Sequence, residues 1–471
     1  MQHFDIAVIG TGSGNSVIDD RFSHLDVAII ERDDVFGGTC LNHGCIPTKM
    51  FAVTADYAAA PEQARRLGVR LGEPRSDWVA IRDRIFGRID PIASGGRQWR
   101  EQAPNVSVFT GEARFVSPHQ LSIGDNTIHA DQIVIATGSS PRPLGLEVPD
   151  ELAGRVYTTD DIMRMDRQPE RIVILGGGFV GAEFGHVFAS LGTDVTVIEL
   201  ADHVLAGQDR EIAEAFAAEF GARARLRLNQ RVVAVEPGPH GDLQVVAEDR
   251  NGVEYLYFAD ALLNATGRVR NSADLNLQAA GVEVRSNGQI RVDDTQRTSV
   301  PHIWALGDVS SDYLLKHVAN AEARAVQHNL LAGPGNVRRT DHRLVPNAVF
   351  SDPQVAAVGA TEEQLIEWGT PYVVSRQRYS DVAYGWALED RGHFVKLLAD
   401  PRSRRLLGAH ILGPQAATLI QPLIQAMTFG LDVQRMAHEQ YWIHPALPEV
   451  VENALLGLLD APVPEALDAP A

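Results

Sequence analysis

The sequence predicts an α/β fold in which two similar α/β units are followed by a smaller α+β domain. Three observations predict it. A buried strand followed by a glycine-rich turn occurs twice, each of these units has a second strand that ends on a glutamate, and the pattern changes to alternating strands and helices from about residue 341. A chain of 471 residues also exceeds what one hydrophobic core usually supports, so about three domains are expected.

The first unit starts with an apolar strand at residues 5–9 and continues into the turn Gly-Thr-Gly-Ser-Gly-Asn at residues 10–15. A second apolar strand at residues 27–30 ends on Glu31. A glycine turn between a strand and a helix lets the backbone approach a pyrophosphate, and the acidic residue can accept hydrogen bonds from a ribose. Asn15 stands where a third glycine is expected, and we expect Gly14 to relieve the crowding there.

The second unit repeats this arrangement with a strand at 171–175, the turn Gly-Gly-Gly-Phe-Val-Gly at 176–181, a helical stretch and a strand at 195–198. This last strand ends on Glu199, whose carboxylate would repel a 2′-phosphate, and residues 200–205 contain no arginine to bind one. NADH is therefore favoured over NADPH, unless Glu199 points to solvent and the choice is made elsewhere. Each unit also has a strand that runs into Ala-Thr-Gly, at residues 136–138 and 265–267, so two Rossmann-like dinucleotide-binding domains are expected.

The C-terminal part is predicted to be an α+β domain with strands near 348–350 and 394–398 and helices near 415–430 and 448–458. The end of the chain is rich in Pro and Ala and is predicted to be a frayed tail. The boundaries that we expect are 1–145 for an FAD-binding domain, 146–267 for an NAD(P)-binding domain, 268–340 for a central domain that completes the FAD site, 341–459 for an interface domain and 460–471 for a flexible tail.

The composition excludes several classes of function. A formal net charge of −19 disfavours nucleic acid and anionic membranes as partners. No apolar run is long enough to span a bilayer, and the first residues do not follow the pattern of a secretory signal, so a cytoplasmic location is expected. Two cysteines in a chain of this length cannot form a stapling framework of disulfides.

The two cysteines, Cys40 and Cys45, are separated by four residues, so that one helical turn would bring the sulfurs together. Such a pair can cycle between dithiol and disulfide if a helix N-terminus or a nearby cation stabilises the thiolate. A structural bridge would gain little from so short a loop, and a zinc site would need two further ligands. No metal site is therefore expected.

Disulfide exchange also needs a general acid, and a histidine suits this near neutral pH. His444 lies in Tyr-Trp-Ile-His-Pro-Ala-Leu-Pro-Glu at 441–449, where Glu449 follows closely enough to orient the imidazole. We therefore expect His444 and Glu449 to form a dyad, although a His-Pro turn taken alone would more often be structural.

Together, these motifs and Ala-Leu-Gly-Asp at 305–308 resemble the pyridine nucleotide-disulfide oxidoreductase family, which includes glutathione reductase and lipoamide dehydrogenase. The resemblance covers nearly the whole chain and implies a homodimeric flavoprotein with FAD, NADH or NADPH as the donor, a small-molecule disulfide substrate and a C-terminal dimerisation domain. Longer segments, at 10–16, 86–92, 313–320, 381–386 and 440–449, resemble the branch of the family that reduces mycothione, the disulfide of mycothiol.

The resemblance also implies roles for individual residues. Cys45 is expected to face the flavin and Cys40 to attack the substrate, while His444 and Glu449 come from the other subunit. Lys49 is expected near flavin N5, paired with Glu183. The cofactor-binding residues implied are Gly10, Gly12, Gly14, Glu31, Gly38, Thr39, Lys49, Ala113, Thr137, Gly138, Gly176, Gly178, Gly181, Glu183, Glu199, Gly267, Asp308, Lys316 and His317.

Two departures leave alternatives open. Glu199 suits a lipoamide dehydrogenase that uses NAD better than the mycothione branch, whose members usually use NADPH. His43, beside Cys45, stands where the family commonly has a small apolar residue, and we interpret it as a surface histidine rather than a second acid. Mercuric and high-molecular-weight thioredoxin reductases are disfavoured because no further cysteine pair exists, and an inactive flavin-binding protein would be expected to lack a cysteine or the dyad.

Overall fold

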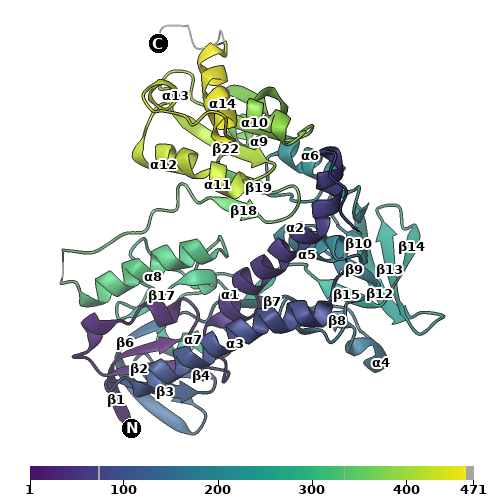
Figure 1. Cartoon of the computed structure of the whole chain (residues 1–471). Coiled ribbons are helices and arrows are strands. Elements are labelled where there is room, and N and C mark those ends of the chain that lie inside the picture. The colour runs from purple at the N-terminus through teal and green to yellow at the C-terminus, as the bar shows by residue number, and fades with distance from the viewer. Residues whose placement is uncertain (73–74, 334, 463–471) are drawn as a thin grey trace.

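The computed structural model describes residues 1–72, 75–333 and 335–462. These residues form two α/β units and a C-terminal α+β domain, which occupy the bottom, the right and the top of Figure 1. The predicted fold class is confirmed. The predicted tail lies outside the described residues from residue 463 onward.

The first unit is built on a seven-stranded sheet of order β3-β2-β1-β6-β5-β4, with β17 paired to β6. Strands β1, β2, β3 and β6 are parallel, whereas β4 and β5 form antiparallel pairs with each other and with β6. Because β17 joins this sheet, the segment expected to complete the FAD site is part of the same layer. The strands are β1 (Gln2–Ile9), β2 (Val27–Glu31), β3 (Val106–Thr110), β4 (Ala113–Ser117), β5 (Gln120–Ile123), β6 (Asn126–Ile135) and β17 (Ile303–Ala305).

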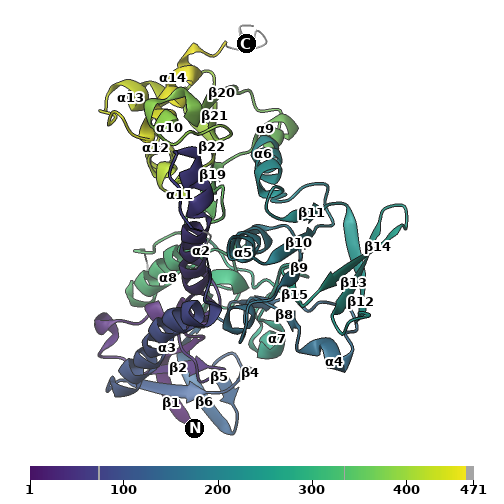
Figure 2. The same cartoon turned by 45° about the vertical axis from the view of Figure 1, so that its right-hand side comes forward.

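The helices of the first unit include two long ones, α2 and α3, which contact each other and run in different directions in Figure 2. After the first glycine turn, however, the described chain forms only two short 3₁₀ turns, η1 and η2, where the second unit has a helix. The helical segments are η1 (Gly14–Ser16), η2 (Asp20–Phe22), α1 (Gly38–Asn42), α2 (Cys45–Arg66), α3 (Trp78–Gln102), η4 (Ala273–Leu275), α7 (Leu277–Ala280), η5 (Gly307–Val309) and α8 (Lys316–Leu331).

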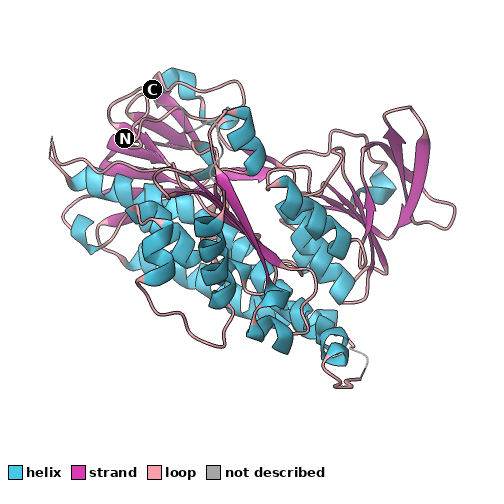
Figure 3. Cartoon of the chain, turned by 90° about the horizontal axis from the view of Figure 1, so that it is seen from above, coloured by secondary structure: helices cyan, strands magenta, loops and turns pink. Residues whose placement is uncertain are grey.

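The second unit has a parallel five-stranded sheet of order β11-β10-β9-β15-β8. A three-stranded antiparallel sheet, β12-β13-β14, projects from it at the right of Figure 3. A two-stranded ribbon, β7 with β16, joins the two units. The elements are β7 (Ser139–Pro141), α4 (Asp150–Ala153), β8 (Val156–Tyr157), η3 (Ile162–Arg164), β9 (Arg171–Leu175), α5 (Phe179–Ser190), β10 (Asp194–Ile198), α6 (Arg210–Phe220), β11 (Arg225–Arg227), β12 (Gln230–Pro237), β13 (Leu243–Asp249), β14 (Glu254–Ala259), β15 (Ala261–Asn264) and β16 (Arg268–Arg270).

The C-terminal domain packs its helices on an antiparallel sheet of order β18-β19-β22-β21-β20. The single helix expected near 415–430 is divided into α11 and α12 at Ile420, the residue between them. The elements are β18 (Asn347–Val349), β19 (Val355–Gly359), α9 (Glu362–Glu367), β20 (Val373–Arg378), η6 (Tyr379–Asp381), α10 (Ala383–Ala387), β21 (Phe394–Ala399), β22 (Leu406–Leu412), α11 (Ala416–Leu419), α12 (Gln421–Phe429), α13 (Val433–His438) and α14 (Pro448–Asp460).

A buried ion pair joins the C-terminal domain to the second unit. Lys396 of β21 is 1% exposed, and its Nζ donates to Asp209 Oδ1, at the start of α6, at 2.8 Å. It also lies 2.6 Å from Glu362 Oε2 of α9.

Among the described helices, none is both long and apolar enough to cross a membrane.

Candidate active site

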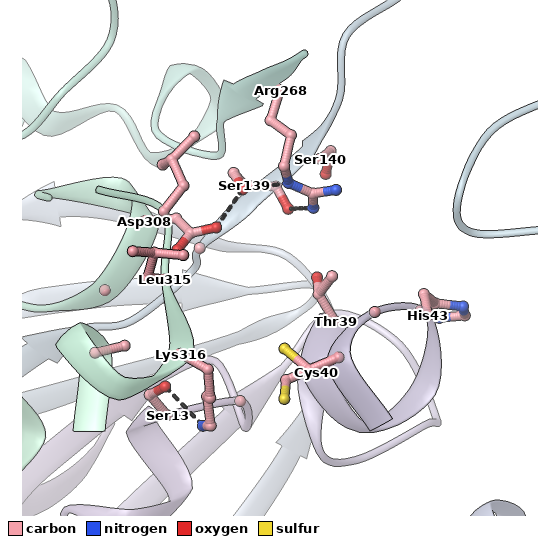
Figure 4. Close-up of a pocket in the computed structure, with 18 of the residues that line it drawn as sticks. Ser13, Thr39, Cys40, His43, Ser139, Ser140, Arg268, Asp308, Leu315 and Lys316 are labelled. Atoms are coloured by element: carbon pink, nitrogen blue, oxygen red, sulfur yellow. Dashed lines mark hydrogen bonds between the residues drawn. The ribbon is translucent and has the colours of Figure 1, made fainter. Parts of the chain in front are cut away.

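A cavity of about 1210 Å³ lies between the first unit, the second unit and the start of the C-terminal domain. One end is lined by residues 9–13 and Glu31, and the other by Cys40, Cys45 and Lys49. Figure 4 shows the middle of this cavity, where residues of the first glycine turn, α1, β7, β16 and α8 meet.

The first glycine turn, residues 10–15, is shaped by close backbone approaches. Gly10 has φ +101°, and a Cβ there would lie 2.4 Å from Ala136 O. A Cβ on Gly14 would lie 2.8 Å from Ala136 Cβ and 3.0 Å from Val8 Cγ1, so Gly14 does occupy the crowded position. Only glycine fits at both places without a shift of the chain.

Arg100, from α3, replaces the hydrogen bonds that a helix would have made after this turn. The side chain is 3% exposed, and its guanidinium donates to Asn15 Oδ1 at 2.7 Å, to Ile18 O at 2.8 Å and to Asn15 O. Burial lowers the pKa of Arg100 to about 10, which leaves it charged at neutral pH. The segment after the first turn is therefore held by a side chain from a distant helix, and sequence reasoning missed this residue.

Glu31 faces the first glycine turn. Its Oε2 accepts hydrogen bonds from the backbone amide of Thr11, at 2.8 Å, and from Thr11 Oγ1. A carboxylate at the end of β2, beside the turn, is placed where a ribose would lie in a dinucleotide fold.

Cys40 and Cys45 are free thiols that line the cavity. They do not share a helical turn, because the chain breaks at His43 and Gly44, so Cys40 lies on α1 and Cys45 is the first residue of α2. The N-terminus of a long helix favours a thiolate at Cys45.

The two thiols have opposite shifts in pKa. The hydrogen bond between them lowers the pKa of Cys45 to about 7, with burial opposing this shift and the charges of Lys49 and Lys316 assisting it. The same hydrogen bond, with burial, raises the pKa of Cys40. Of the two thiols, Cys45 is therefore the one that ionises near neutral pH, and when it does so the remaining proton of the reduced pair resides on Cys40.

Lys49 forms an ion pair with Glu183 of α5, with Nζ at 2.6 Å from Oε1 and 2.5 Å from Oε2. Glu183 Oε1 also accepts the backbone amide of Phe350 at 3.0 Å, and Lys49 Nζ lies 4.6 Å from the centre of the Phe350 ring. The expected Lys49–Glu183 pair is thus present, and Phe350, from the loop after β18, is a contact that sequence reasoning missed.

Lys316 and Asp308 line the cavity opposite the thiols (Figure 4). Lys316, the first residue of α8, donates from Nζ to Ser13 Oγ of the first glycine turn at 2.8 Å. Asp308 Oδ2 accepts from Ser139 Oγ at 2.5 Å, and Arg268 donates to the same hydroxyl at 2.7 Å. Ser13, Ser139 and Arg268 are further residues that sequence reasoning missed.

His43 lines the cavity but its ring points away from Cys40 (Figure 4). Its Nδ1 lies 3.0 Å from the carbonyl oxygen of Asp160, which fits donation to that carbonyl. The ring is half-buried and joins the first unit to the second, so it is more enclosed than the surface histidine that we expected.

The second glycine turn, residues 176–181, runs into α5, which already starts at Phe179. A Cβ on Gly176 would lie 2.6 Å from Ala265 O, and one on Gly181 would lie 1.9 Å from Gly176 O. Glu199 faces this turn, since its carboxylate accepts from the amides of Gly177 at 2.6 Å and Ala201 at 2.8 Å.

His444 and Glu449 form a hydrogen-bonded pair, with Nδ1 2.6 Å from Oε1. This hydrogen bond holds the pKa of Glu449 below its usual value. The pair lies just before and within the first turn of α14, in the C-terminal domain away from α1 (Figure 1), and neither residue lines the cavity. Within one chain, the dyad and the thiols are therefore separate.

Most of the expected cofactor-binding residues do line the cavity. Those that do are Gly10, Gly12, Glu31, Gly38, Thr39, Lys49, Ala113, Thr137, Gly138, Glu183, Asp308, Lys316 and His317. Gly14 lies behind the first turn, and Gly176, Gly178, Gly181, Glu199 and Gly267 belong to the second unit, outside this cavity.

The cavity fits FAD. Its volume exceeds that of most pockets for small ligands, and it extends from the first glycine turn to the thiols. Gly38 and Gly12 approach each other so closely that a Cβ on Gly38 would lie 2.6 Å from Gly12 Cα, which leaves bare backbone beside the path of an extended dinucleotide.

Comparisons with known proteins agree with this geometry. Residues 4–325 match the family model described as pyridine nucleotide-disulphide oxidoreductase, and residues 345–455 match its dimerisation domain. The mycothione reductase of Mycobacterium tuberculosis is 48% identical over 97% of this chain and 100% of that protein. A dihydrolipoyl dehydrogenase of Haloferax volcanii is 34% identical over 96% of each chain. Among solved structures, the HOCl-induced flavoprotein disulfide reductase RclA from Escherichia coli has a TM-score of 0.84 and 27% identity, covering 96% of this chain and 99% of its own.

Proposed function

This chain belongs to the pyridine nucleotide-disulphide oxidoreductase family, and we propose that it reduces mycothione, the disulfide of mycothiol. As a member of this family it is an FAD-containing, NAD(P)H-dependent disulfide oxidoreductase. One observation carries the choice of substrate: the identity to a mycothione reductase is 48%, against 34% to a dihydrolipoyl dehydrogenase over the same length.

Separate groups of residues are assigned to the two nucleotides. The first glycine turn, Glu31 and Lys316 would hold the adenosine and diphosphate parts of FAD, and Asp308 and Lys49 would lie near its other end. The second glycine turn and Glu199 would hold the nicotinamide dinucleotide. When bound, FAD would supply the redox chemistry that couples the reduced nicotinamide to the Cys40–Cys45 disulfide.

The thiol chemistry follows from where the proton resides. Cys40 holds the proton of the reduced pair, so it must lose this proton before its sulfur attacks the substrate disulfide. The attack forms a mixed disulfide on Cys40 and releases one mycothiol thiolate. The Cys45 thiolate then attacks the Cys40 sulfur, which restores the internal disulfide and releases the second thiolate.

The dyad would supply the acid and base for these steps. An imidazole oriented by Glu449 can accept the proton of Cys40 and return it to the departing thiolate. Because the dyad is separate from the thiols within one chain, His444 of one protomer would serve the cysteines of the other in a homodimer. The match to the family's dimerisation domain supports this arrangement.

The preferred donor would be NADH. The Glu199 carboxylate lies beside the second glycine turn, where it would accept hydrogen bonds from a ribose and repel a 2′-phosphate. The same residue supports the second candidate function, an NAD-dependent dihydrolipoamide dehydrogenase.

Steady-state turnover separates the two functions. Purified holoenzyme would be assayed with mycothione, lipoamide and glutathione disulfide, each with NADH and with NADPH. Turnover chiefly with mycothione supports the proposal. Turnover chiefly with lipoamide would replace it with the second candidate.

The donor is tested with Glu199→Gln, which removes the charge and keeps the size. The ratio of kcat/KM for NADPH to that for NADH should rise about tenfold. Glu170→Gln, at an exposed glutamate just before β9, is the matched control. An unchanged ratio would show that Glu199 does not select the donor.

The shared active site is tested by mixing two defective chains. Cys40→Ser and His444→Ala would be co-expressed with different tags and the mixed dimer purified. If His444 acts across the dimer, each mixed dimer has one intact site of two, so the purified mixed dimer should regain about half of wild-type turnover. If His444 acts within its own chain, mixing should restore nothing.

A further inference from the structure

Toward the end of the first sheet that is remote from the cavity, three side chains of its two inner strands converge: His3 of β1 and His129 and Asp131 of β6. His3 and His129 are paired in the parallel ladder between β1 and β6, and Asp131 follows His129 by two positions on the same strand. Residues two apart on a strand share a face, so the register places all three side chains on one face.

The ligand atoms of these residues, His3 Nε2, His129 Nδ1 and an Asp131 carboxylate oxygen, lie within 4.8 Å of one another. His3 Nε2 lies 3.0 Å from Asp131 Oδ1, and His129 Nδ1 lies 3.8 Å from the same oxygen. In a tetrahedral zinc site the ligand atoms lie roughly 3.4 Å apart, so small side-chain rotations would close the group on one ion.

One nitrogen in this group lacks a partner. His129 Nδ1 is buried and has no hydrogen-bond partner in the part of the chain that the structure describes. The 3.8 Å to Asp131 is too long for a hydrogen bond, and a buried polar atom without a partner is costly. A cation between His129, Asp131 and His3 would satisfy this nitrogen.

The ring of His129 is stacked on one further imidazole, His119, which in turn is stacked on a second, His302. It stacks on His119 at 5.3 Å between ring centres, and His119 stacks on His302 at 3.7 Å. His119 Nδ1 lies 2.9 Å from Ala130 O and His302 Nε2 lies 3.0 Å from Pro118 O, so these two rings are fixed by backbone carbonyls. This stack restricts the orientation of the His129 ring.

We propose that His3, His129 and Asp131 form a binding site for a divalent transition-metal ion of the zinc class. Two imidazole nitrogens and one carboxylate oxygen suit zinc and its neighbours, whereas Mg²⁺ and Ca²⁺ prefer oxygen ligands throughout. His3 and Asp131 are more than half exposed, so an ion can enter from solvent and find further positions for water.

The site is separate from the catalytic cavity. None of its three residues lines the cavity, which opens at the carboxyl ends of β1 and β6, whereas the site lies toward their N-terminal ends. A bound ion would hold the start of β1 to β6, and it would stabilise the folded first unit in proportion to its occupancy.

Calorimetric titration of zinc chloride into metal-free holoenzyme tests the proposal. The enzyme would be kept oxidised, so that Cys40 and Cys45 form a disulfide and cannot bind the ion. We expect one zinc ion per chain, with at least about tenfold weaker binding in His129→Ala and in Asp131→Asn. His240→Ala, at an exposed histidine in the loop before β13, should bind as the wild type does.

A second measurement guards against loss of folding in the variants. FAD content and turnover should be unchanged in His129→Ala and Asp131→Asn, and zinc should raise the Tm of the wild type but not of these two variants. Binding of less than one ion per chain by the wild type, or equal affinity in all the proteins, would overturn the proposal.

Discussion

The two glycine turns of this chain begin alike and are completed differently. In each, the first glycine lies against the carbonyl of an Ala-Thr-Gly strand, so that a Cβ on Gly10 would lie 2.4 Å from Ala136 O and one on Gly176 would lie 2.6 Å from Ala265 O. The second turn passes into α5, which starts at Phe179, whereas after the first turn the described chain has only short 3₁₀ turns.

The difference shows two ways to present backbone amides and positive charge to a dinucleotide. The second turn relies on its own helix, whose N-terminus carries a partial positive charge. The first turn relies on two side chains from distant segments, Arg100 for its carbonyl groups and Lys316 for its charge. The second turn should therefore be sensitive to local steric changes, and the first to changes far away in the sequence.

The largest effect is expected for Gly181→Ala, which tests whether the second turn is sensitive to a local steric change. The new Cβ would lie 1.9 Å from Gly176 O, and because this is a backbone atom, relieving the clash requires a movement of the main chain. We expect KM for NADH to rise by about 100-fold or more while FAD content stays at one per chain. Gly154→Ala, where a Cβ would meet nothing within 4 Å, is the control, and an unchanged KM in Gly181→Ala would contradict the assigned site.

Arg100→Met tests whether the first turn is held from outside. It leaves the carbonyl groups of Asn15 and Ile18 without their donor in a buried place. The free energy of unfolding should fall by about 3 kcal/mol, as measured by urea denaturation. Arg114→Met, at an exposed arginine of β4, should change it by less than about 0.5 kcal/mol. Equal stability of the two variants would mean that Arg100 is not needed to stabilise the first turn.

Lys316→Met tests the charge at the first turn. Loss of the ammonium group beside Ser13 should increase the dissociation constant of FAD about tenfold, as measured by flavin fluorescence on dilution. Lys316→Arg should keep most of the affinity because it keeps the charge. If both variants lose FAD equally, the shape of the lysine matters rather than its charge.

The smallest effect is expected on the pKa of Cys45. Its pKa is about 7, so its reactivity toward iodoacetamide in the reduced enzyme should rise as the pH increases through 7. Because the charge of Lys316 lowers this pKa, Lys316→Met should move the midpoint upward by less than about one pH unit. Alkylation at Cys45 would be followed by mass spectrometry, and a midpoint that falls would contradict the assignment. Gly181→Ala should leave the midpoint where it is.

Local patterns predicted the strands, both glycine turns and the two glutamates, because apolar runs and glycines act within a few residues. The resemblance to a family supplied the Lys49–Glu183 pair, which no local pattern predicts across 134 positions. Asn15 in place of a third glycine was a signal that the first helix was missing, but the compensating Arg100 lies 85 positions away. Gly44 between the cysteines could have predicted the break between α1 and α2.

The dependence of the first turn on distant residues has a consequence for biosynthesis. The second unit has its strands and turn in one stretch of chain between residues 156 and 264, so it can close soon after leaving the ribosome. The first turn gains Arg100 only after α3 is made and Lys316 only after two thirds of the chain. Cotranslational folding proceeds from the N-terminus, yet here the N-terminal cofactor site must wait until at least two thirds of the chain is made, so FAD should be bound late in synthesis.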